Sequence, residues 1–100
     1  MTHLQITAAA EAELREATAW YRERDVRVAQ RFTAEVRRTL ELIESFPQIG
    51  GRVPGVADGD VRRLPVHTFP YHLIFLALID HVEVIGLAHN RRRPAYFMSR

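Results

Sequence analysis

The sequence predicts an α+β fold in which a hairpin of two helices packs on a mostly antiparallel, four-stranded sheet, in the order β-α-α-β-β-β. Two long segments with the apolar spacing of helices follow one another almost without a loop, and two strongly apolar segments with the spacing of strands come near the end. The chain has 100 residues, of which 47% are hydrophobic. This is the size and composition of one globular domain, so we expect a single domain over residues 1–100.

The chain is expected to begin with a short strand that leads into the first helix. Leu4 and Ile6 alternate with polar residues over residues 3–7, as in a half-buried strand. Thr7 is suited to cap a helix N-terminus, because its hydroxyl can accept a hydrogen bond from a free backbone N–H group. The alanine-rich segment that follows predicts a helix over residues 8–24.

A second helix is expected to follow the first almost directly. Asp25 is suited to cap a helix over residues 26–46, and Pro47 ends it. With so short a connection, the two helices form an antiparallel hairpin with one apolar side. This side needs a sheet to cover it. The apolar stripe of the second helix consists of Ala29, Phe32, Val36, Leu40 and Ile43.

The second half of the chain is expected to form most of the sheet. Residues 47–60 contain four glycines and two prolines, which is typical of a loop. Strands are predicted over residues 61–66, 70–78 and 82–88, the last two as a hairpin. Pro65 indicates that the first of these lies at an edge or bends there, since proline has no N–H group to donate.

Strict alternation gives the last two strands an apolar side chain on both faces of the sheet. The helical hairpin covers only one face. We therefore expect an exposed apolar patch on the other face, large enough to indicate a partner. Its expected members are Ile74, Leu76, Leu78, Ile85 and Leu87.

Positive charge is concentrated in the second half of the chain. The formal net charge is +2, but residues 1–60 carry 8 arginines against 10 acidic residues, whereas residues 61–100 carry 6 against 2. All 14 basic residues are arginine, whose forked, planar donor group suits phosphate and carboxylate. This asymmetry predicts an anionic partner, either nucleic acid or an acidic protein segment.

Composition also disfavours several classes of protein. The chain has no cysteine, which excludes disulfides and cysteine-based zinc sites. Neither a signal-peptide pattern nor an apolar run approaching the roughly 20 residues of a membrane span is present. We expect a cytoplasmic protein that has no membrane contact and no cofactor.

Three histidines, His67, His72 and His89, lie near the arginines of the sheet half. Their spacing matches no metal motif, so we expect no metal site. Either His72 or His89, beside arginines that hold a phosphate, would suit acid–base chemistry on a phosphodiester, because histidine titrates near neutral pH. Hydrogen bonding at the rim of the sheet is the alternative role, and we favour it.

Three consecutive arginines, Arg91, Arg92 and Arg93, follow directly on the last predicted strand. A solvated charge run and a binding surface are both compatible with this pattern. The buried strand fixes the direction in which the cluster points, which makes a binding surface as well supported as a solvated charge run. Arg62 and Arg63 are expected to extend the same cationic surface, because neighbouring strands of the sheet lie side by side.

Four segments together resemble the RelE/ParE superfamily of type II toxin-antitoxin toxins, and are most similar to its ParE branch. They are the alanine-rich first helix, FPQIGGR, FPYHLIF and VIGLAHNRRRPAYF, in the same order and over nearly the whole chain. The resemblance implies a small bacterial toxin that is neutralised by the C-terminal segment of a cognate antitoxin. It places that segment on the uncovered sheet face and the cationic end. For ParE-like members, the resemblance implies inhibition of DNA gyrase without a set of catalytic residues.

The RelE branch implies a different activity, which is cleavage of mRNA on the ribosome. Carried across by position, this activity would use His72 or His89 as acid or base, Arg63 and Arg92 to hold phosphate, and Tyr96 for stacking or proton transfer. His72 stands where that pattern has an arginine. A degenerate toxin that only binds its antitoxin is a third alternative.

We prefer a non-enzymatic gyrase inhibitor over a ribonuclease that acts on the ribosome and mRNA. In this interpretation, the residues that bind the target or the antitoxin are Arg62, Arg63, His89, Arg91, Arg92, Arg93 and Tyr96.

Overall fold

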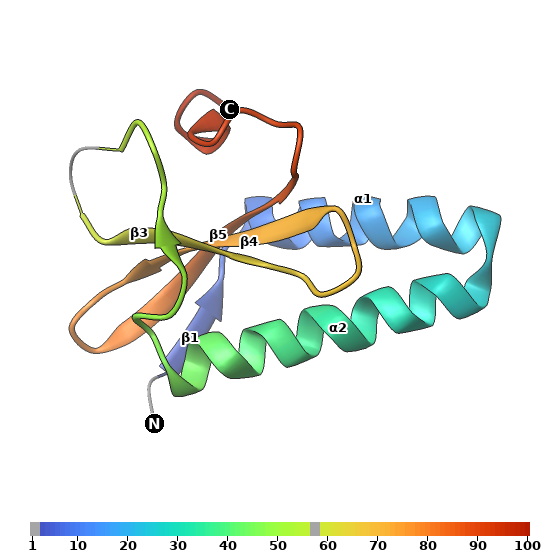
Figure 1. Ribbon diagram of the computed structural model, residues 1–100, viewed down its shortest axis with the longest axis horizontal. Helices are drawn as coiled ribbons and strands as arrows, with labels where there is room; N and C mark the ends of the chain where they lie inside the picture. The colour runs from blue at the N-terminus through green and yellow to red at the C-terminus, as the bar shows by residue number, and fades with distance from the viewer. Residues whose placement is uncertain (1–2, 57–58) are drawn as a thin grey trace.

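The computed structural model describes residues 3–56 and 59–100 and confirms the predicted α+β class (Figure 1). The strands of these residues form a five-stranded sheet in the order β1-β5-β4-β3-β2, in which β1 is parallel to β5 and the other pairs are antiparallel. The sheet has one strand more than the four predicted, because a two-residue strand forms inside the predicted loop. The elements are β1 (His3–Ile6), α1 (Ala8–Arg24), α2 (Val26–Ser45), β2 (Gly51–Arg52), β3 (Val61–Pro65), β4 (Tyr71–Ala77), β5 (His81–His89) and a 3₁₀ turn (Tyr96–Met98).

Local capping defines the helical hairpin. The Thr7 hydroxyl accepts a hydrogen bond from the N–H group of Ala10 at 3.2 Å, as expected for the first residue before α1. Asp25 alone links the two helices: its N–H group donates to the carbonyl of Tyr21, and its carboxylate accepts from the N–H group of Arg27. One residue therefore ends α1 and begins α2, which holds the helices antiparallel.

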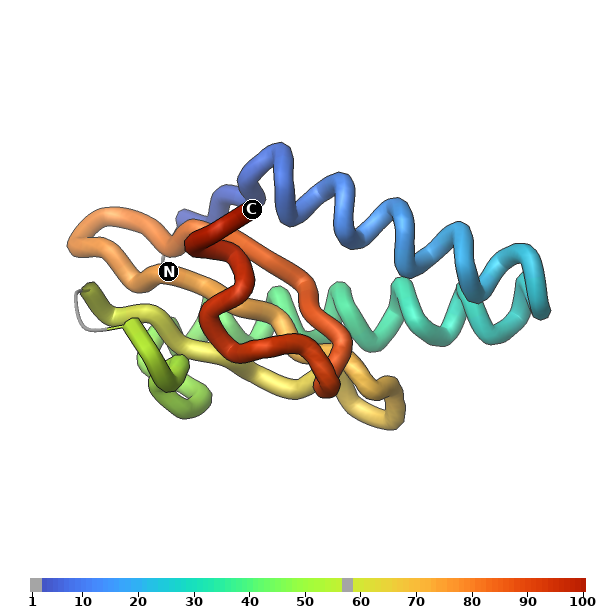
Figure 2. Tube along the Cα trace, turned by 90° about the horizontal axis from the view of Figure 1, so that it is seen from above, coloured from blue at the N-terminus to red at the C-terminus, as the bar shows by residue number. Residues whose placement is uncertain are grey.

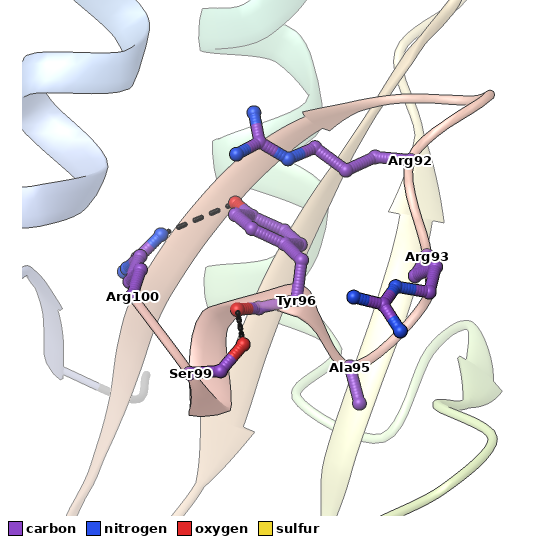
Figure 3. A pocket seen from close by; sticks show the side chains of 6 residues that line it. All are labelled: Arg92, Arg93, Ala95, Tyr96, Ser99 and Arg100. Atoms are coloured by element: carbon purple, nitrogen blue, oxygen red, sulfur yellow. Dashed lines mark hydrogen bonds between the residues drawn. The ribbon is translucent and has the colours of Figure 1, made fainter.

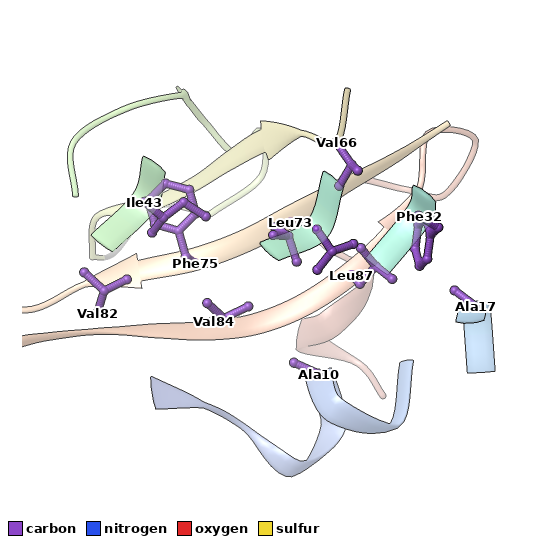
Figure 4. Close-up of a cluster of buried hydrophobic side chains, with 11 residues drawn as sticks. Ala10, Ala17, Phe32, Ile43, Val66, Leu73, Phe75, Val82, Val84 and Leu87 are labelled. Carbon is purple, nitrogen blue, oxygen red and sulfur yellow. The ribbon is translucent and has the colours of Figure 1, made fainter. Parts of the chain in front are cut away.

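The main hydrophobic core lies between the helical hairpin and one face of the sheet (Figure 4). Phe32 and Ile43 of α2 pack on side chains of the two central strands, β4 and β5. This cluster contains all but one residue of the apolar stripe predicted for the second helix, and the remaining one, Ala29, is also buried. The sheet members of the cluster are Leu73, Phe75, Val82, Val84 and Leu87.

A β-bulge changes the predicted faces of β5. Pairing passes from Phe75 opposite Val84 to Ile74 opposite Gly86, so Ile85 is an extra residue in β5. The bulge turns Leu87 toward the helices and the following residue away from them. The expectation that Leu87 belongs to the open face is wrong, because strict alternation takes no account of an inserted residue.

The face of the sheet opposite the helices is covered by the chain itself. After β5 the C-terminal segment crosses this face, on the other side of the sheet from α2 (Figures 1 and 2). Tyr96 and Phe97 of this segment form a second apolar cluster with Val53, Val56 and the fully buried Ile74. The expectation of an uncovered face is therefore wrong.

The remaining members of the expected patch differ in their exposure. Leu76 and Ile85 are half-buried against the second cluster, whereas Leu78 is 41% exposed. Leu78 lies beyond the end of β4, in the hairpin, where the C-terminal segment gives it no cover. The apolar surface that stays open is thus at the hairpin rather than on the sheet face.

The same hairpin holds a small charged cluster. Nδ1 of His81 lies 2.7 Å from a carboxylate oxygen of Asp80, and Nε2 lies 3.2 Å from one of Glu83. Hydrogen bonding to Asp80, and next to Glu83, raises the pKa of His81 above its ordinary value of 6.5. The hydrogen bond from His81 lowers the pKa of Asp80.

We expect His81→Gln to lower the melting temperature more at about pH 5.5 than at about pH 9. Because the pKa of His81 is raised in the folded state, its stabilising contribution is complete below the unfolded pKa and is lost as the pH rises through the folded pKa. The lowered pKa of Asp80 keeps that carboxylate ionised at both pH values. Thermal unfolding monitored by circular dichroism measures the difference, with the exposed His67→Gln as control. An equal shift at both pH values would contradict the assignment.

Candidate target-binding surface

The chain after β5 forms a tight turn that carries the three consecutive arginines. The N–H group of Asn90 donates to the carbonyl of Pro70, and that of Arg92 donates to the carbonyl of His89, both at 2.9 Å. The N–H group of Arg91 donates to Nδ1 of His89 at 3.2 Å. These bonds attach the arginine turn, residues 91–93, to the ends of both central strands. All three arginines are exposed, so the backbone of the turn is held at a fixed place while their side chains reach into solvent.

A pocket of about 390 Å³ lies between the arginine turn and the C-terminal segment (Figure 3). The guanidinium carbon of Arg92 lies 4.6 Å from the centroid of the Tyr96 ring, in a cation–π contact. Among the described residues, the lining of the pocket includes three arginines, of which Arg100 is paired with Glu13, and it includes no aspartate or glutamate. Such a lining suits an anionic group. The lining residues are Arg92, Arg93, Ala95, Tyr96, Ser99 and Arg100.

Glu13 of α1 holds the C-terminal segment in place. One of its carboxylate oxygens accepts hydrogen bonds from the Tyr96 hydroxyl at 2.9 Å, from the N–H group of Leu87 at 3.1 Å and from Nη1 of Arg100 at 2.7 Å. Burial, and next the hydrogen bond to Glu13, raise the pKa of Tyr96 above its usual range. The hydroxyl therefore stays protonated and donates to Glu13, which fixes the ring on which Arg92 stacks.

The side chains of Glu13 and Arg100 also occupy the outer edge of β5, beyond the point where β1 ends. The pairing of β1 with β5 ends at Val84, so the backbone groups that follow need other partners. Arg100 donates to the carbonyl of Ile85, and Glu13 accepts from the N–H group of Leu87. Sequence reasoning missed Glu13, because it lies 83 positions from Tyr96 in a helix with several other glutamates.

Arg63 and His72 lie in a different pocket, of about 460 Å³, on the face of the sheet opposite the helices. Nδ1 of His72 lies 3.0 Å from the side-chain oxygen of Asn90. The ring is 6% exposed, and its Nε2 atom has no hydrogen-bond partner within the described part of the chain. His72 is thus mainly a buried residue that ties β4 to the arginine turn.

His89 and Arg62 point toward the helical side of the sheet. The ring of His89 packs against Tyr71 at 5.4 Å and lines a third pocket with Arg92. The guanidinium of Arg62 pairs with Asp60 at 2.8 Å and donates to two carbonyls of the loop that precedes β2. Arg62 therefore holds this loop against β3 and adds no free charge to the arginine turn.

The structure does not gather the five residues of the ribonuclease pattern into one site. Arg63 and His72 line one pocket, Arg92 and Tyr96 line another, and His89 faces the opposite side of the sheet from His72. The Tyr96 hydroxyl is also engaged by Glu13. Within residues 3–56 and 59–100, no group of three or more histidines and acidic residues is placed to hold a metal ion, and no helix has the length and apolar character to cross a bilayer.

The fold and the arginine turn together define a class of small α+β proteins with a cationic surface at one end of the sheet. One chain in a solved structure, "Chromosomal ParDE TA system from P. aeruginosa", has this fold with a TM-score of 0.74 and 18% sequence identity, over 89% of this chain and 96% of that chain. The family model described as "ParE toxin of type II toxin-antitoxin system, parDE" matches residues 4–94. The chain belongs to this family of toxins, as its sequence resemblance implies. No curated protein matches the chain.

Proposed function

We propose that this ParE-family toxin inhibits DNA gyrase and that a cognate antitoxin neutralises it. Gyrase inhibition is the activity that the resemblance to the ParE branch implies. The observation that best supports it is the arginine turn, which is exposed, attached to both central strands and adjacent to a pocket lined by three arginines. Such a surface favours the phosphates of DNA held by the enzyme, or acidic side chains of the enzyme itself.

The mechanism that we propose is binding without chemistry on the target. A catalytic tyrosine needs a hydroxyl that is free to exchange a proton, whereas that of Tyr96 is buried and donates to Glu13. The antitoxin is expected to place an acidic segment over the arginine turn. Antitoxin and target then compete for the same cations, which accounts for neutralisation.

A triple replacement tests the proposal. Arg91→Gln, Arg92→Gln and Arg93→Gln together should raise the toxin concentration needed to inhibit gyrase supercoiling by at least about tenfold, because a hydrogen bond to a charged group contributes about 1.5–3 kcal/mol. The matched control replaces Arg22, Arg31 and Arg37, which are also exposed but lie on the two helices, with glutamine. Circular dichroism confirms that both variants fold.

Three outcomes would contradict the proposal. One is that the wild-type toxin leaves supercoiling and gyrase-mediated DNA cleavage unchanged, and another is that the two triple variants lose inhibition equally. Cleavage of mRNA in a translation reaction, with normal supercoiling, would support the ribonuclease alternative instead.

A further inference from the structure

Three large apolar side chains are exposed at the end of the molecule where α2 ends and the β4–β5 hairpin turns. Phe46 is 61% exposed, Leu78 is 41% exposed and Ile79 is fully exposed. These three line a groove of about 440 Å³, which we call the hairpin groove. Leu42, 40% exposed and four residues before Phe46, lines a separate pocket with Pro65 and His67.

The turn itself does not require these side chains. Tight turns favour glycine, asparagine, aspartate and serine, each of which eases the reversal of the backbone. Here Leu78 and Ile79 precede Asp80 at the reversal, where they contribute little to the buried clusters. Exposed apolar side chains that gather around a groove mark an interaction surface.

Acidic residues adjoin the lining of the hairpin groove in the sequence. Asp80 follows Ile79 directly, and its side chain is 84% exposed although one oxygen is hydrogen-bonded to His81. Glu44 precedes Ser45 at the end of α2, and Glu83 lies further along the hairpin, where it also contacts His81. The arginine turn lies at the opposite end of β5, which spans His81–His89 and is therefore about 25 Å long. The two ends of the sheet thus differ in charge, and each end can bind a separate partner.

We propose that the hairpin groove binds a protein segment in which aliphatic or aromatic side chains are flanked by lysine or arginine. Apolar side chains of the segment fill the groove against Phe46 and Ile79, and its cations face Glu44 and Asp80. A second copy of this chain is a poorer occupant, because symmetric pairing brings the two acidic borders together. Three exposed side chains also fall short of the roughly 1,200 Å² that a stable dimer buries.

The test uses two short synthetic peptides with the same leucine pattern, one flanked by lysines and the other by glutamates. Isotope-labelled, full-length toxin is titrated with each peptide and followed by NMR. The lysine peptide should shift the amide signals of Phe46, Leu78 and Ile79, and the glutamate peptide should bind at least about tenfold more weakly.

Two matched variants locate the binding. Ile79→Ser should weaken binding of the lysine peptide at least about fivefold, since it removes an apolar side chain that the complex buries. Met98→Ser removes another exposed apolar side chain, 64% exposed, from the C-terminal segment and should leave binding unchanged. Glu44→Gln should weaken the binding of the lysine peptide, while the apolar contacts between the peptide and the groove stay in place.

The proposal is overturned if the two peptides bind equally, if the shifted signals lie at the arginine turn, or if Met98→Ser weakens binding as much as Ile79→Ser. Self-association of the toxin that Ile79→Ser abolishes would assign the groove to a second copy instead. None of these results depends on gyrase. Failure here and failure of the proposed function are therefore distinguishable.

Discussion

Replacing Gly86 with alanine is expected to dislodge Tyr96 and disrupt the pocket beside the arginine turn. A Cβ atom at this position would lie 2.6 Å from the Tyr96 hydroxyl oxygen and 3.4 Å from Nη1 of Arg100. The clash breaks the contact between Tyr96 and Glu13, so we expect the free energy of unfolding to fall by about 1–3 kcal/mol. The proposed inhibition of gyrase should fall as well, because Arg92 loses the ring on which it stacks.

The control for this prediction is Gly51→Ala. A Cβ atom at Gly51 meets no atom within 4 Å, so this variant should keep both its stability and its activity. Urea unfolding and a supercoiling assay measure the two properties. If the variants of Gly86 and Gly51 behave alike, Tyr96 is not held against β5 as described.

The largest loss of stability is expected from Phe32→Ala. Phe32 is fully buried, and its ring centroid lies 5.1 Å from that of Tyr21, 5.2 Å from that of Phe69 and 5.5 Å from that of Tyr71. Removing the ring leaves a cavity between α2 and the sheet, which lowers the free energy of unfolding by about 3–5 kcal/mol. This is a large part of the roughly 5–15 kcal/mol typical of a small domain.

Phe46→Ala provides the matched comparison. Phe46 is 61% exposed at the end of α2, so its replacement should cost less than about 1 kcal/mol. Chemical denaturation of both variants gives the two values. Similar losses for the two phenylalanines would show that the core does not centre on Phe32.

The helical hairpin was predictable almost to the residue because its boundaries depend on local chemistry. Thr7 and Asp25 satisfy backbone N–H groups two or three positions away, and these short-range bonds can be read from the sequence. The second helix ends at Ser45, one residue before its predicted end, with Phe46 as the capping residue.

The errors arise where distant segments meet. The bulge at Ile85 and the cover that Tyr96 gives to the sheet depend on contacts between segments far apart in the chain, which alternation within one strand does not contain. The two-residue strand β2 has no apolar pattern of its own, and Arg62 holds the loop before it.

The candidate surface was predictable only in part. The position of Arg91–Arg93 directly after the last strand placed them correctly at the end of the sheet. Whether neighbouring cations are free depends on their acidic partners in space. Arg62 has such a partner in Asp60. Arg63, which follows Arg62 in the sequence, faces a different pocket on the other side of the sheet.

The edge of β5 beyond Val84 also bears on how this toxin behaves without its antitoxin. An open strand edge is a template on which another chain can add a strand, and this is a common route to aggregation. Here the side chains of Glu13 and Arg100 already occupy backbone groups of Leu87 and Ile85. The free toxin is thereby protected at this edge against growth of the sheet from one molecule to the next.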